Sequence, residues 1–235
     1  NTIHVFKYMK KKFLSIVFFL VFSTKAIAHS EHYKDINVLE YELFRNNQSI
    51  GYHNYKFERN NNYLIVKSVI DFKITKLGFD LYSYTGTTEE KYEEDQLIKF
   101  LSKTNQNKKI KKTEITLNKE KNKLIISGSE NQLISPKENT VGTWWNHEII
   151  QAKAQISAVS GRIIDQKVTF LGKEKLNLYG KTYNTLHFNL SSTDESLPES
   201  KKLNIDVWYE EKTNLWLKAA FNKTGQWEYR LKIKN

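Results

Sequence analysis

The sequence contains no cysteine. The chain therefore has no disulfide, no thiol nucleophile and no cysteine that could carry a lipid anchor. A chain of this length needs no such crosslinks, because a domain of about 200 residues buries about 70 % of its unfolded surface and folds on its own core.

The sequence also lacks an apolar run long enough to cross a membrane as a helix. The candidate, Phe13–Phe22, has ten residues, whereas a spanning helix needs about 20. It follows Lys10–Lys12 and precedes Ala26–Ala28, which is the pattern of a secretory signal peptide. We expect residues 9–28 to be a signal peptide cleaved after Ala28. Residues 1–8 precede the only methionine and are expected to be an over-extended reading frame.

Export without disulfides favours a bacterial periplasm, because exported animal proteins of this size usually carry them. The formal net charge of +11 falls to +6 on cleavage, since the leader holds five lysines and no acidic residue. The only dense basic run is Lys108–Lys112. We interpret this run as a solvated hairpin tip, with attraction to anionic lipid headgroups as the alternative. No recognition helix accompanies it, so no nucleic-acid partner is expected.

From Leu39 onward, apolar residues recur at every second position, which is the period of a strand with one buried face. Asparagine-rich turns separate the first of these runs. The pattern covers Leu39–Leu43, His53–Phe57, Leu64–Ile74, Phe79–Tyr92, Leu97–Thr104, Thr113–Leu117 and Leu124–Ser127. After an interruption it resumes over Arg162–Leu171, Glu174–Leu178, Tyr183–Leu190, Leu203–Tyr209, Leu215–Phe221 and Trp227–Ile233.

The interruption, Gly142–Ser160, has apolar residues near helical spacing, which predicts one short helix. About twelve antiparallel strands are too many for a flat open sheet. We therefore predict an all-β fold with a single strongly curved antiparallel sheet, either an incomplete barrel or a folded-over sheet. One β-rich domain is expected over residues 39–235, preceded by a polar tail at residues 29–38.

No motif of a catalytic centre is present. The sequence lacks a Gly-x-Ser-x-Gly turn, a glycine-rich phosphate loop and a His-Glu-x-x-His pair. Adjacent carboxylates such as Glu89 and Glu90 face opposite sides of a strand, and we interpret them as solvated side chains. We therefore expect neither an enzyme nor a cofactor.

Cleavage after Ala28 would make His29 the N-terminal residue. A free amine and an imidazole on one residue can together chelate Cu(II). No other histidine has a spacing that completes such a site, so residues 29–32 are interpreted mainly as a polar tail. A metal site at His29 is kept as a distant alternative, with weak copper binding at most.

The densest aromatic cluster is Trp144–Trp145, followed by His147. Two adjacent indoles on extended chain cannot both face one core, so at least one should meet a cavity, a lid or solvent. We expect both to lie at the entrance of an apolar cavity and to bind a ligand together with His147, Tyr82 and Tyr84. Core packing is the alternative interpretation.

Short motifs along the mature chain resemble an uncharacterised exported bacterial family, domain of unknown function sixty-one thirty-four. The matching features are Ile50–His53, Tyr82-x-Tyr84 before Glu89–Glu90, Leu101-x-x-Thr104–Asn105, Trp144–Asn146, Ser160–Gly161, Val168–Gly172 and Val207–Tyr209. The resemblance implies location and architecture and transfers no catalytic residue. The hairpin after Trp208 is also similar to the C-terminal meander of periplasmic lipoprotein carriers, whose curved sheet holds acyl chains; this likeness is at the level of the fold.

These observations favour a non-enzymatic periplasmic protein that binds an apolar or amphipathic envelope molecule, such as a lipid. The alternative is a structural or partner-binding envelope protein with a filled core. A copper protein that uses His29 is the third hypothesis. The identity of the ligand and the oligomeric state are left open.

Overall fold

The computed structural model describes residues 33–60, 62–128 and 132–234. The expected signal peptide at residues 9–28, the preceding residues 1–8 and His29 lie outside the described residues. The described elements are β1 (Val38–Arg45), β2 (Gln48–Asn60), β3 (Tyr63–Lys76), β4 (Phe79–Glu93), β5 (Gln96–Gln106), β6 (Lys109–Asn118), β7 (Lys123–Ser127), β8 (Leu133–Pro136), β9 (Thr140–Val141), the 3₁₀ helix η2 (His147–Ile150), β10 (Ala154–Ile156), β11 (Ile163–Leu178), β12 (Lys181–Ser192), β13 (Asn204–Glu210), β14 (Trp216–Asn222) and β15 (Gln226–Lys234).

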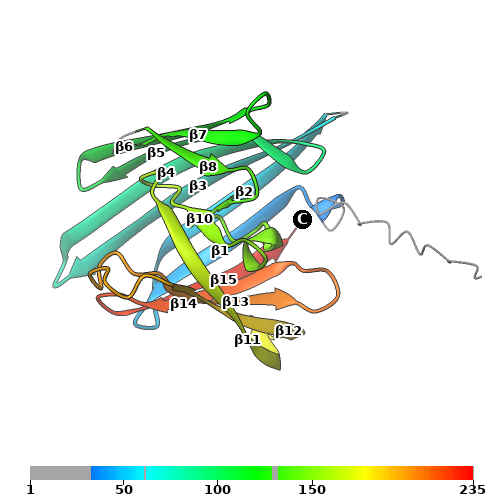
Figure 1. Cartoon of the computed structure of the whole chain (residues 1–235). Coiled ribbons are helices and arrows are strands. Elements are labelled where there is room, and N and C mark those ends of the chain that lie inside the picture. The colour runs from blue at the N-terminus through cyan, green and yellow to red at the C-terminus, as the bar shows by residue number, and fades with distance from the viewer. Residues whose placement is uncertain (1–32, 61, 129–131, 235) are drawn as a thin grey trace, which may run out of the picture.

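The fifteen strands form one sheet in the order β8-β7-β6-β5-β4-β3-β2-β1-β15-β14-β13-β12-β11-β10-β9. Neighbours are antiparallel except β9 and β10, which pair in parallel. The first half of the chain extends from β1 on one side, and the second half returns to β1 from the other side, where β15 pairs with it. Figure 1 shows the strong curvature of the resulting sheet.

The two edges of this sheet are consecutive in the chain. Edge strands β8 and β9 are joined only by residues 137–139, and the backbone N–H of Asn139 donates to the carbonyl of Pro136. A link of this length spans at most about 14 Å. The sheet must therefore curl until its edges come near one another, which makes the fold an incomplete barrel with its seam between β8 and β9.

The concave face of the sheet carries the core. On β1, Leu39, Tyr41 and Leu43 are buried inside, whereas Glu40 and Glu42 alternate with them on the outer face. This is the side-chain period of a strand with one solvated face.

Trp216 lies at the centre of the core. Its ring stacks on Tyr41 with centroids 4.0 Å apart and meets Tyr55 and Trp144 edge-on. The indole and phenol rings interlock in stacked and T-shaped pairs, which stabilise a core beyond the area they bury.

The segment between β9 and β11, residues 142–162, packs against this concave face. Ser102 on β5 donates a hydrogen bond to the carbonyl of Ala158. Gly161 has φ +74°, and a Cβ added there would lie 2.8 Å from a methyl carbon of Ile126. Only glycine satisfies both requirements, because other residues are strained at this φ and have no room. The interruption predicted from the sequence thus fills part of the interior.

The predicted class, an all-β fold with one strongly curved antiparallel sheet, is confirmed. The described residues contain fifteen strands, above the predicted twelve, because β8, β9 and β10 have two to four residues each and are too short to show alternation. The two strands predicted around Gly172 are one strand, β11, with a bulge between Phe170 and Gly172. The predicted helix is only the four-residue η2.

The polar tail predicted at residues 29–38 differs from the structure from Tyr33 onward. Tyr33 and Ile36 are buried in the core. Arg59 donates hydrogen bonds to the carbonyls of both residues, and the Tyr33 hydroxyl accepts one from the backbone N–H of Trp216. This segment therefore closes one side of the core. Its aromatic and aliphatic side chains are too few to produce a periodic pattern.

Candidate functional site

An apolar cleft of about 660 Å³, here called the outer cleft, opens on the concave face where β3 and β4 meet the β14–β15 hairpin. Apart from Lys223 and Thr224, its walls are apolar or aromatic side chains. The lining residues are Ile70, Phe72, Ile74, Tyr82, Tyr84, Val159, Phe221, Lys223, Thr224, Trp227 and Tyr229.

The walls of the outer cleft are held by contacts between rings. Phe72 stacks on Tyr84 with centroids 5.0 Å apart and an interplanar angle of 8°, and it meets Trp227 edge-on at 5.3 Å. Trp227 in turn stacks on Phe221. Because these rings support one another across four strands, the cleft is preformed, as small-molecule sites usually are.

A second cavity of about 230 Å³, here called the inner chamber, adjoins the outer cleft and shares Ile70, Tyr84, Val159 and Tyr229 with it. Its walls combine apolar groups with hydroxyls. Its other lining residues are His53, Tyr55, Ser68, Gly86, Thr87, Thr88, Thr104, Gly142, Thr143, Trp144, Gln155, Ser157, Ala158 and Ile164.

The inner chamber is uncharged. Its lining set contains no Asp, Glu, Lys or Arg. Burial lowers the pKa of His53 to about 3, so its imidazole is neutral near pH 7. Burial raises the pKa of Tyr84 to about 12 and that of Tyr55 and Tyr229 well above the ordinary value, so their phenols are neutral too. A charged group would lose its hydration here without gaining a partner of opposite charge.

Polar groups cross the chamber wall from β2 to β4. His53 Nε2 lies 3.1 Å from Ser68 Oγ, which lies 2.7 Å from Thr88 Oγ1. The other imidazole nitrogen, Nδ1, lies 3.5 Å from the hydroxyl of Tyr55. This chain of neutral groups can donate or accept hydrogen bonds toward an uncharged ligand group.

The contact between Ser68 and His53 resembles a nucleophile with its base, but its chemistry is unsuited to catalysis. A general base works best with a pKa near the operating pH, and the pKa of His53 is about 3. The third position, which a carboxylate would occupy to stabilise an imidazolium, holds the neutral Tyr55 hydroxyl. The arrangement is therefore a polar wall.

The structure separates the two adjacent tryptophans. Trp144 lines the inner chamber, and its ring meets Trp216 and Tyr229 edge-on. Its Nε1 is buried and has no hydrogen-bond partner in the protein. A buried N–H normally has a partner, so this unpaired donor is one of the exceptions in the described core.

Trp145 faces the opposite way and is buried in the core, where its ring meets Tyr33, Phe57 and Tyr92 edge-on. This differs from the expectation that both indoles lie at a cavity entrance. The two residues lie in a turn, which directs their side chains to different parts of the interior.

The remaining predicted ligand residues also divide. His147 is buried in η2 beside Trp145 and contributes to neither cavity. Tyr82 lines the outer cleft, and Tyr84 lines both cavities. The structure thus places Trp144, Tyr82 and Tyr84 around the two cavities, whereas Trp145 and His147 line neither of them.

Sequence reasoning missed the polar wall of the chamber. The signal was present, because Ser68 interrupts an otherwise apolar face between Val66 and Ile70. A small hydroxyl at an inward position of a long strand indicates a place where the core is not filled by hydrocarbon. Its partner Thr88 on β4 can be recognised only from the register of the two strands.

Glu90 is fully buried, in contrast to the expectation that the carboxylates at positions 89 and 90 are solvated. Its carboxyl accepts hydrogen bonds from the Tyr92 hydroxyl at 2.5 Å and from Trp145 Nε1 at 2.9 Å. Burial raises the pKa of Glu90 to about 7, and these hydrogen bonds oppose the rise. Neither cavity is lined by Glu90, so its role is in the core.

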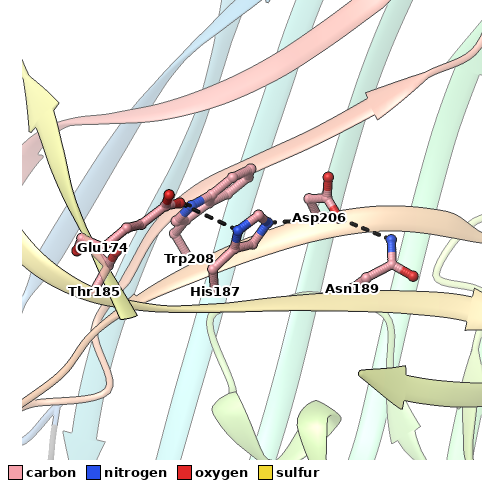
Figure 2. Close-up of polar contacts among 6 residues, drawn as sticks. All are labelled: Glu174, Thr185, His187, Asn189, Asp206 and Trp208. Carbon is pink, nitrogen blue, oxygen red and sulfur yellow. Dashed lines mark hydrogen bonds and ion pairs between the residues drawn. The ribbon is translucent and has the colours of Figure 1, made fainter. Parts of the chain in front are cut away.

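A polar cluster on the outer face of β11, β12 and β13 is the other concentration of titratable groups (Figure 2). His187 stacks on Trp208 with centroids 4.0 Å apart, and its Nδ1 lies 3.3 Å from Glu174. Trp208 Nε1 also donates to Glu174. On the other side, Asn189 donates to Asp206 at 2.9 Å. The cluster ties three strands together and lines neither cavity.

Among the described residues, no group of three or more histidines and carboxylates is arranged to hold a metal ion. In the same part of the chain, no helix is both long and apolar enough to cross a membrane.

The fold of this chain is similar to that of a solved structure. The chain is similar to a solved structure titled as a beta-barrel-like protein of domain of unknown function DUF1849 from Brucella abortus, with a TM-score of 0.61 and 12 % sequence identity over 85 % of this chain and 97 % of that one. No curated protein matches the sequence. A family model described as domain of unknown function (DUF6134) matches residues 41–232, and the chain therefore belongs to this family.

Proposed function

We propose that this protein is a non-enzymatic binder of an apolar or amphipathic molecule of the bacterial envelope, held in the outer cleft and the inner chamber. The single observation that carries the proposal is that the two cavities adjoin, with Ile70, Tyr84, Val159 and Tyr229 lining both. An apolar cleft thus lies beside a chamber with polar but uncharged walls. The periplasmic setting rests on the signal peptide expected at residues 9–28.

The walls favour a ligand whose buried part carries no charge. Hydrocarbon fits the rings of the outer cleft, and a hydroxyl, ester or amide group fits the hydrogen-bonding groups around Ser68 and the unpartnered Nε1 of Trp144. A charged headgroup would remain at the mouth, where Lys223 lines the cleft. A neutral monoacylglycerol has the required combination of groups.

The expected affinity follows from the size of the cavities. Both lie within or near the range of about 300–1,000 Å³ that small-molecule sites occupy. Burying an acyl chain of about 14 carbons contributes on the order of 11 kcal/mol, at about 0.8 kcal/mol per methylene. Immobilising the ligand costs several kcal/mol of this, so we expect micromolar dissociation constants.

The test is a tryptophan-fluorescence titration of the parent protein with a monoacylglycerol below its critical micelle concentration. Trp144→Phe keeps a ring against Trp216 and Tyr229 but removes the buried N–H. We expect this variant to bind several-fold more weakly and to be at least as stable as the parent, because it no longer buries an unpaired donor.

Two further variants serve as controls. Trp145→Ala should lose about 3–5 kcal/mol of stability, since it leaves a cavity in the core and removes a donor from Glu90. Phe170→Ala, on an exposed aromatic of β11, should change neither binding nor stability by much. Absence of binding by the folded parent protein would contradict the proposal and favour the structural, partner-binding reading.

A further inference from the structure

The β3–β4 hairpin projects beyond the rest of the sheet. Pairing between β2 and β3 ends at Gly51 and Phe72, and pairing between β4 and β5 ends at Tyr84 and Gln106. Residues 73–83 therefore form a two-stranded ribbon without neighbouring strands, here called the β3–β4 ribbon, and Figure 1 shows it extending past the adjacent hairpins.

The tip of this ribbon is apolar and exposed. Leu77, Phe79 and Leu81 have 89 %, 74 % and 57 % of their surfaces accessible to solvent. Leu77 and Phe79 are the most exposed large apolar side chains among the described residues, and Leu81 lies two residues further along the chain. Exposed apolar groups gathered in one place mark an interaction site more often than isolated ones do.

The backbone of the tip points to the same conclusion. The ribbon turns through Leu77 and Gly78, both with positive φ. Such a turn favours asparagine or glycine at its first position, as at Asn46–Asn47 and Asn107–Lys108, whereas the turns at Glu94–Asp95 and Tyr179–Gly180 depart from this preference. At Leu77 the chain instead holds a bulky apolar residue in a strained conformation and exposes it to water, which favours neither the turn nor solubility.

A basic hairpin tip lies against the base of the ribbon. The β5–β6 turn is joined to Ser83 through the backbone N–H of Asn107 and through the Asn107 side chain. Five lysines and no acidic residue occur between residues 103 and 112, and Lys108 and Lys109 are exposed. Apolar side chains beside a basic patch are the combination that binds anionic lipid surfaces.

The ribbon is also continuous with the outer cleft. Ile74 and Tyr82, at the base of the ribbon, line the cleft together with Phe72 and Tyr84. The base of the ribbon is therefore part of the wall of the cleft.

We propose that the β3–β4 ribbon and the lysines of the β5–β6 turn form a docking surface for an anionic lipid membrane. Leu77, Phe79 and Leu81 enter the interface, and Lys108 and Lys109 contact the phosphate groups. Docking itself does not require a bound ligand; transfer of a lipid into the cleft rests on the function proposed above.

The experiment is flotation of the full mature chain with vesicles of phosphatidylglycerol and phosphatidylethanolamine, with phosphatidylcholine vesicles for comparison. We expect binding to the anionic vesicles, weakened by added salt. Leu77→Asn should reduce it at least about tenfold, since it removes one buried apolar side chain. The matched control Leu171→Asn replaces an equally apolar exposed residue on β11 and should leave binding unchanged.

The basic part of the surface is tested in the same way. Lys108→Gln with Lys109→Gln should weaken anionic binding about 25-fold, because each lysine near such a surface contributes roughly fivefold. Lys121→Gln with Lys123→Gln removes the same charge from the β6–β7 turn at the other end of β6 and should have little effect. Equal losses in both pairs would overturn the proposal, as they would show attraction by net charge alone.

The result of this experiment can be distinguished from the result of the ligand-binding test of the proposed function. Leu77 does not line either cavity, so Leu77→Asn should bind a monoacylglycerol in solution as the parent does. Failure of the parent protein to bind anionic vesicles would overturn docking to lipid and favour a protein as the partner of the tip, whether or not the cleft binds a ligand.

Discussion

Single residues in this protein owe their behaviour to which side of a strand they occupy. Glu89 and Glu90 are adjacent, yet Glu89 is exposed and Glu90 is fully buried beside Tyr92 and Trp145. Trp144 and Trp145 are also adjacent and separated, in their case by a turn. A buried ionisable side chain affects the stability of the fold, whereas its exposed neighbour has little effect.

The buried carboxyl of Glu90 should make stability depend on pH. Its pKa is raised to about 7 in the folded protein, against about 4.3 in an unfolded chain. The stabilisation from its protonated form is complete below the unfolded pKa and is lost as pH rises through about 7. The loss amounts to about 3–4 kcal/mol.

Urea unfolding of the parent protein and of Glu90→Gln at about pH 5 and about pH 8 measures this effect. We expect the difference in unfolding free energy between the two proteins to change by about 3 kcal/mol across this interval, in favour of the variant at the higher pH. Comparison at each pH removes the contribution of His53, whose lowered pKa acts in the opposite direction. A difference that does not vary with pH would show that Glu90 titrates normally.

At the scale of elements, two segments depart from regular sheet structure for different reasons. Residues 142–162 contribute only the three-residue strand β10 to the sheet and otherwise pack against its concave face, where Gly161 is required by φ and by contact with Ile126. The β3–β4 ribbon leaves the sheet toward solvent and buries little. A two-stranded ribbon without neighbours is marginally stable, so its sequence is free to serve a purpose other than folding.

Replacement of Leu77 by Asn should stabilise the fold. Leu77 has φ +51°, a conformation that costs most residues about 1–2 kcal/mol and that asparagine tolerates. It also makes few contacts that the change could remove, since it is 89 % exposed. We expect the midpoint of thermal unfolding to rise by a few degrees, which corresponds to about 1 kcal/mol. A lower midpoint would mean that the Leu77 side chain supports the ribbon.

At the scale of the whole molecule, the order of strands follows the order of the chain. Strands β1 to β8 follow one another outward from β1 on one side. Strands β9 to β15 lead back to β1 from the other edge, so the seam lies between the consecutive strands β8 and β9. Because β1 pairs with β15, the described start of the chain is held within the sheet.

The sequence also predicts processing of the N-terminal segment. We expect export to remove residues up to Ala28, so that the mature protein begins at His29. N-terminal sequencing of protein recovered from the periplasm measures the cleavage site. A start before His29 would contradict the predicted cleavage site. Tight copper binding that is lost when the N-terminus is blocked would support a copper site at His29.

The sequence by itself determined the class of fold, because alternation over long strands such as β3 records which face is buried wherever the chain lies. It also named Trp144, Tyr82 and Tyr84, which line the two cavities; ligand binding by these residues stays a prediction. Tertiary structure alone decided which of two adjacent tryptophans faces a cavity, that Glu90 is inside, and that the hydroxyls of Ser68 and Thr88 meet. These outcomes depend on strand register and on the packing of residues 142–162 against the sheet, and both are set by contacts between residues far apart in the chain, which a local pattern does not record.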